Sequence, residues 1–192
     1  MAQAKVATAQ RSRVPPLTQR LADVLNGSGH KLALQILLVV TAAHWAEHAF
    51  QAIELFVLGW PRSVALGALG LVWPALVTSE WLHYLFALAM LIGLVILRPA
   101  FHGEARTWWD VALVIQVWHH VEHALLLGQA LTGHYLFGGM VPTSVLQVFF
   151  PRIELHLFYN AVVTLPMLTA VFEHGRPSGA RRQATCTCAA RP

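Results

Sequence analysis

The sequence predicts an all-α integral membrane protein folded as a bundle of four transmembrane helices. Of the 192 residues, 56% are hydrophobic and only 11% are charged, whereas soluble domains usually carry about 25% charged residues. Because so little polar surface could face water, the lipid bilayer is the expected partner. Four apolar stretches are each close to the roughly 20 residues that cross a hydrocarbon core: residues 32–58, 76–97, 108–131 and 153–172.

The first expected element is a short amphipathic helix ahead of these spans. Pro15 and Pro16 are followed by apolar residues at helical spacing, and Asn26-Gly27 would end the helix. We interpret residues 1–30 as a cytoplasmic segment that lies at the membrane interface. This basic segment has no early apolar run, so we expect no cleavable signal peptide.

The apolar segment 64–79 could be a loop, a half-helix or a fifth span. Pro74, Gly67 and Gly70 interrupt it, and proline and glycine disfavour a continuous helix. We therefore expect a loop or half-helix against the membrane, and the transmembrane domain is expected to cover residues 31–174.

Basic residues predict the orientation in the membrane. They gather in residues 1–31, around the connection between the second and third spans, and in the tail 175–192, while the two opposite loops hold only Arg62 and Arg152. By the positive-inside rule both termini are cytoplasmic, and we expect the plasma membrane of a bacterium. The net charge of +4 reflects this orientation, and no basic–aromatic pattern indicates nucleic-acid binding.

The tail 175–192 is expected to be disordered and cytoplasmic. It holds both cysteines, Cys186 and Cys188, which we interpret as free thiols because disulfides are rare in that compartment. A soft-metal contact there is the minor alternative.

An internal repeat is the most informative feature of the chain. Residues 44–49 read HWAEHA and residues 119–124 read HHVEHA, so both follow the pattern H-x-x-E-H-A. The next span in each half opens with glutamate and histidine, at Glu80 and His83 and again at Glu154 and His156. We expect two repeated two-helix units, residues 31–99 and 106–174.

Helix geometry places the repeated residues at one depth. Residues three and four positions apart share a helix face, so each motif presents two histidines and one glutamate together. With a rise of 1.5 Å per residue, six histidines lie about 17 to 24 Å from the cytoplasmic surface. A lone intramembrane histidine often only joins helices by hydrogen bonds, but six in one layer, outward of the midplane, indicate a shared site.

The expected site binds two metal ions, because a cation is the partner that satisfies imidazoles and carboxylates together. Each half would supply three imidazoles and one carboxylate. The predicted ligands are His44, Glu47, His48 and His83 in the first half, and His119, Glu122, His123 and His156 in the second. Glu47 and Glu122 are also the predicted catalytic residues, and supporting polar residues are expected at Gln51, Glu80, Gln116, His120 and Glu154.

Histidines and glutamates from facing helices of a bundle favour a dinuclear iron centre, with copper or zinc as alternatives. No cysteine lies in the spans, which excludes an iron–sulfur cluster and a zinc site with thiolate ligands. Such a dinuclear centre would activate oxygen for a hydroxylase, desaturase or oxidase that acts on a lipophilic substrate, with an electron-donor protein where the reaction needs one. Two other functions stay open: a b-type cytochrome with haem b between two histidines, and a transporter of metal ions or protons.

Overall fold

The structure, a computed structural model, describes residues 16–176 and Cys188, and these contain helices and no strands. Four helices are long and apolar enough to cross a membrane, as predicted: His30–Val57, Glu80–Ala100, Gly103–Thr132 and Arg152–Gly175. Their α-helical parts are α2 (His30–Ala52), α5 (Glu80–Leu97), α6 (Gly103–Thr132) and α7 (Arg152–Gly175). Residues 1–15 and most of the predicted tail 175–192, with Cys186, lie outside the described residues.

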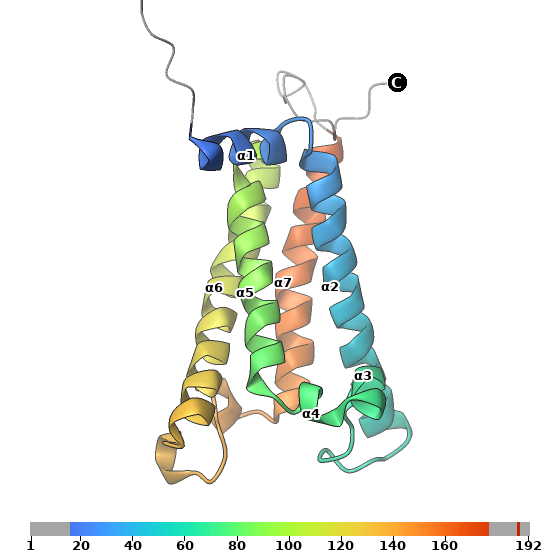
Figure 1. Ribbon diagram of the computed structural model, residues 1–192. Helices are drawn as coiled ribbons and strands as arrows, with labels where there is room; N and C mark the ends of the chain where they lie inside the picture. Colours follow the sequence, from blue (N-terminus) through green and yellow to red (C-terminus); the bar gives the residue numbers. More distant parts are fainter. Residues whose placement is uncertain (1–15, 177–187, 189–192) are drawn as a thin grey trace, which may run out of the picture.

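The short helix α1 (Leu17–Asn26) lies across one end of the bundle (Figure 1), and it ends at the predicted Asn26. The start of α2, the connection between α5 and α6, and the end of α7 lie at this same end, which we call the α1 end (Figure 1). The opposite end, here the loop end, carries α3, α4 and the segment that joins α6 to α7.

The segment 64–79 forms two short helices, α3 (Gly67–Val72) and α4 (Pro74–Val77), and no fifth span. The break falls at Trp73, and Pro74 occupies the start of α4, a position where a missing N–H costs nothing. The second span therefore begins at Glu80, later than the predicted residue 76. Ser79 caps α5 by accepting a hydrogen bond from the backbone N–H of Trp81 at 3.2 Å.

Along its axis, the bundle has an apolar half at the α1 end and a polar half at the loop end. Helix α6 packs along α5 and α7, while α2 contacts α7 and α5 less extensively. The main hydrophobic core fills the half at the α1 end, around the fully buried Leu94, Phe101, Trp109 and Met167. The same four helices carry polar side chains into the half at the loop end, and that half contains the candidate site.

Candidate functional site

Six imidazoles meet between the four long helices, and we call them the histidine cluster. They are His44 and His48 of α2, His83 of α5, His119 and His123 of α6, and His156 of α7. Ring centroids separated by 4.4 to 5.9 Å connect all six. Two imidazoles that share one ion at about 2.0–2.1 Å have centroids roughly 5 Å apart, so pairs of rings in the cluster have a spacing compatible with a shared ion.

The two halves of the chain mix within the cluster. His156, from the second half, lies next to His48 of the first half as well as His83, His119 and His123. His83, from the first half, stacks on His123 of the second at 5.9 Å. The rings of the two halves therefore lie in one group, and His156 is next to four of the other five.

Three of the imidazoles are held by their Nδ1 atoms. His83 and His156 donate from Nδ1 to the backbone carbonyls of Ser79 and Arg152, at 3.3 and 2.8 Å, and His48 donates to Oε1 of Gln51 at 2.7 Å. These acceptors assign the proton to Nδ1 and leave a lone pair on each Nε2. Metal-binding histidines are usually oriented by such a bond from the other ring nitrogen.

Several buried ring nitrogens have no hydrogen-bonding partner among the described residues: Nδ1 of His119, Nδ1 of His123 and Nε2 of His156. Nε2 of His48 lies 3.1 Å from Nε2 of His44, and two tetrahedral ligands of one ion would be about 3.3 Å apart. The imidazoles approach one another mainly in pairs. Among the described residues, the cluster does not bring three ring nitrogens within 4.8 Å of one another, so binding of one ion by three imidazoles requires small side-chain rotations.

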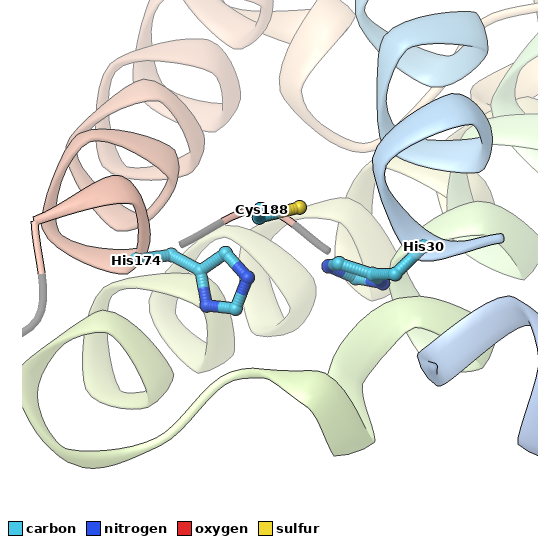
Figure 2. Close-up of side chains that lie close together, drawn as sticks. All are labelled: His30, His174 and Cys188. Atoms are coloured by element: carbon cyan, nitrogen blue, oxygen red, sulfur yellow. The ribbon is translucent and has the colours of Figure 1, made fainter. Parts of the chain in front are cut away.

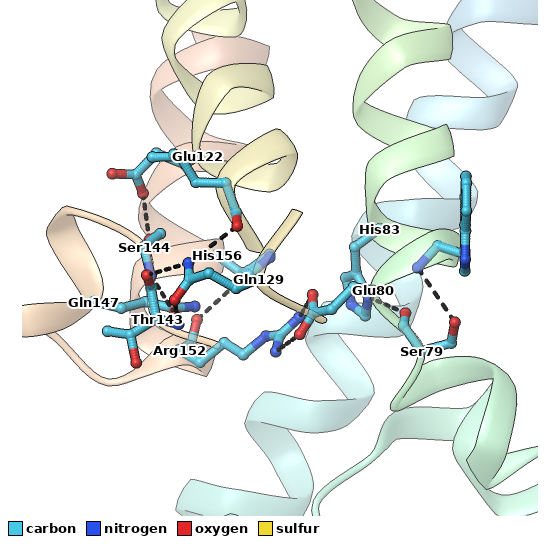
Figure 3. A network of polar contacts seen from close by, with 12 residues as sticks. Ser79, Glu80, His83, Glu122, Gln129, Thr143, Ser144, Gln147, Arg152 and His156 are labelled. Carbon is cyan, nitrogen blue, oxygen red and sulfur yellow. Dashed lines mark hydrogen bonds and ion pairs between the residues drawn. The ribbon is translucent and has the colours of Figure 1, made fainter. Parts of the chain in front are cut away.

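The two motif carboxylates turn towards the loop end. Glu47 accepts hydrogen bonds from the backbone N–H of Leu69 at 3.0 Å. Glu122 accepts from the hydroxyl of Ser144 and the N–H of Leu146, at 2.8 and 2.9 Å (Figure 3). The carboxylates of Glu47 and Glu122, which the sequence suggested as metal ligands and catalytic residues, thus bond to the segments at the loop end that follow their helices.

Seven residues after each of these glutamates, a second polar side chain also accepts a hydrogen bond from the segment that follows its helix. Glu54 accepts from the N–H of Gly67 at 2.8 Å, and Gln129 accepts from the N–H of Leu136 at 2.9 Å. Gly67 has a φ of +77° and leaves no room for a Cβ beside Glu47, so only glycine fits this position. The side chain of Glu54 is buried.

Two ion pairs close the site towards the loop end. Arg152 binds both carboxylate oxygens of Glu80 at 2.6 Å, next to His83 and His156 (Figure 3). Glu154, which the sequence placed near Arg152, pairs instead with Arg62. Residues two positions apart on a helix do not face each other, which explains why Arg152 and Glu154 find different partners.

The other expected supporting residues lie around the edge. Gln116 donates to the backbone carbonyl of Ala87 at 3.0 Å. His120 packs against Tyr84 rather than against the histidine cluster. Tyr159, which the sequence prediction missed, is buried against the ring of His119 at 4.4 Å. It lies three residues after His156, so the helical spacing alone could have identified it.

Among the described residues at least four cavities reach the histidine cluster, and two of these are far larger than the other two. An apolar cavity of about 310 Å³ lies between α2 and α5 and is lined by His44, His48, His83 and by apolar residues such as Val40 and Phe86. A more polar cavity of about 220 Å³ approaches from the loop end past Arg62 and Arg152, and reaches His48, His83 and His156. The first is within the size range of small-molecule sites.

Comparison with known protein families, curated proteins and solved structures finds no match to this chain.

Proposed function

We propose that this chain is a membrane metalloprotein whose histidine cluster binds two redox-active metal ions and oxidises a lipophilic substrate with oxygen. The observation that carries the proposal is the meeting of six imidazoles from four helices. A charged side chain at the centre of a membrane helix costs about 2.5–3.5 kcal/mol, and a buried imidazole nitrogen without a partner is also unfavourable. Bound cations would offset that cost for all six imidazoles together.

The donor atoms bear on the choice of metal. Imidazole suits copper, iron, zinc and nickel, and di-iron centres in helix bundles also use glutamate ligands. Here Glu47 and Glu122 both bond to segments at the loop end. The arrangement therefore favours ions bound by imidazole alone, with copper as the first candidate. In a di-iron centre of the expected kind, Glu47 or Glu122 would have to give up its present hydrogen bonds to bind iron.

The two larger cavities fit a reaction at the boundary between lipid and water. The apolar cavity between α2 and α5 would admit a lipophilic substrate from the bilayer. The polar cavity would connect the same histidines, His48 and His83, to water at the loop end. Oxidation of a quinol suits this arrangement, because two quinols supply the four electrons and four protons that reduce one O₂ to two waters. Hydroxylation or desaturation would also need an electron-donor protein.

The orientation and the repeat belong to the same proposal. Basic residues are more frequent at the α1 end, so the positive-inside rule makes that end cytoplasmic and puts the histidine cluster in the non-cytoplasmic half. The matching bonds of Glu47 and Glu122 to segments at the loop end, and of Glu54 and Gln129 seven residues later, support two repeated units that cover residues 31–99 and 106–174.

Oxygen uptake by the protein purified in detergent and loaded with copper or iron tests the proposal. With a short-chain quinol we expect metal-dependent oxygen consumption that falls at least tenfold in His48→Ala, since His48 lines both larger cavities. The control His102→Ala changes an exposed residue at the α1 end and should keep full activity.

Equal rates with and without metal, or in His48→Ala and the unsubstituted protein, would contradict the proposed activity. A sharp Soret band that shifts on reduction would favour the cytochrome alternative, and metal uptake into vesicles without oxygen consumption would favour a transporter.

A further inference from the structure

A second group of metal-binding side chains lies at the α1 end, away from the histidine cluster. His30 begins α2, His174 lies in the last turn of α7, and Cys188 comes from the tail. Their side chains point towards one another (Figure 2), and one ligand atom from each lies within 4.8 Å of the others. His30 and His44 are separated by 14 positions on one helix, about 21 Å along its axis, so the two sites are distinct.

His30 is oriented as a metal ligand would be. Its Nδ1 donates to the backbone carbonyl of Leu25 at 3.0 Å, which leaves the lone pair on Nε2. The side chain is 0% exposed, and its Nε2 has no hydrogen-bonding partner within residues 16–176 and Cys188. A buried polar atom without a partner is unfavourable, and a bound cation at this nitrogen would remove that cost.

The neighbouring rings hold the two imidazoles in place. His174 is 6% exposed, and its ring centroid lies 5.2 Å from that of His30, the separation of imidazoles on one ion. Phe101 packs against both histidine rings and stacks on Trp109 at 3.9 Å. Both histidines are therefore buried side by side.

Cys188 is partly buried against the apolar core at the α1 end, although the sequence suggested a thiol in a disordered tail. One sulfur and two imidazole nitrogens are typical zinc ligands, and three protein ligands leave a fourth position for water or another group. The donor set excludes calcium and magnesium, which bind oxygen ligands.

We propose that His30, His174 and Cys188 form a second metal site, which binds Zn²⁺ or a similar borderline divalent ion and ties the C-terminal tail to the start of α2 and the end of α7. The site is independent of the proposed oxidation, since it shares no residue with the histidine cluster and needs no redox-active metal.

Cobalt(II) binding tests this site even though the histidine cluster is present in the same protein. A thiolate-to-cobalt charge-transfer band requires sulfur, and the spans that form the histidine cluster contain no cysteine. We expect the full-length protein in detergent to develop this band, with an intensity that corresponds to one sulfur-bound Co²⁺ per chain. Once the histidine cluster is saturated, one further equivalent of Zn²⁺ should displace this Co²⁺ and remove the band. Cys188→Ser should abolish the band, whereas the matched variant Cys186→Ser should retain it.

A second readout does not depend on the colour of the ion. Zn²⁺ should slow alkylation of Cys188 at least tenfold in the unsubstituted protein, measured by mass spectrometry of the tail peptide, and should protect much less in His174→Gln. The absence of a band at saturating cobalt, a band that survives Cys188→Ser, or alkylation of Cys188 that zinc does not change would each overturn the proposal. Bound metal and oxygen uptake at the histidine cluster should persist in Cys188→Ser, so failure of one site is distinguishable from failure of the other.

Discussion

Replacing His156 with alanine should remove most of the metal bound at the histidine cluster. His156 is buried on α7 and its ring lies next to four of the other five imidazoles, so both ions would lose a shared or adjacent ligand. Loss of even an indirect support of a metal ligand typically weakens binding about 10–100-fold. We expect His156→Ala to reduce metal content by well over half, measured by elemental analysis after gel filtration.

The control for this prediction is His134→Ala. His134 is exposed at the loop end, where its Nδ1 donates to the backbone carbonyl of Thr132, and its loss should leave metal content unchanged. His156→Asn, which keeps a polar side chain in the cavity, separates loss of metal from loss of fold. Unchanged metal content in both His156 variants would refute the assignment of the cluster as ligands.

Replacing Arg152 with methionine should be the most destabilising change at the loop end. It leaves the carboxylate of Glu80, only 8% exposed, without its bidentate partner. Breaking a buried pair costs 3–5 kcal/mol; we expect about 3 kcal/mol, the low end, because Arg152 is itself 37% exposed. The measurement is the midpoint of thermal unfolding in detergent.

Two further variants make this prediction specific. Arg62→Met breaks the pair with Glu154, whose partners are 57% and 29% exposed, so it should cost no more than about 1 kcal/mol. Arg152→Met combined with Glu80→Gln should recover much of the lost stability, since no buried charge is then stranded. A similar loss in Arg62→Met and Arg152→Met would show that burial of Glu80 is not the cause.

The sequence predicted those parts of the fold that depend on local patterns. Apolar length identified the four spans, proline and glycine identified the broken segment 64–79, and Pro16 and Asn26 bounded α1. Helical spacing and rise also brought the six histidines to one level, because a straight helix fixes the face and depth of each residue.

Hydrogen-bond and ion-pair partners that lie far apart in the sequence could not be predicted from such local patterns. Glu47 shares a face with His44 and His48, yet its carboxylate bonds to the backbone N–H of Leu69, 22 residues later in the short helix α3. Arg152 pairs with Glu80, 72 residues away. The spacing of His30, His174 and Cys188 follows no local pattern, since only the return of α7 to the start of α2 brings them together.

X-ray absorption at the metal edge tests the central claim most directly, with the protein loaded with copper or iron in the background of His174→Gln and Cys188→Ser, which leaves one imidazole at the tail site. The account predicts about two ions per chain, each with nitrogen ligands near 2.0–2.1 Å and the outer-shell scattering of imidazole rings. A folded protein that retains no ion after loading, or ions whose spectra lack imidazole scattering, would contradict it.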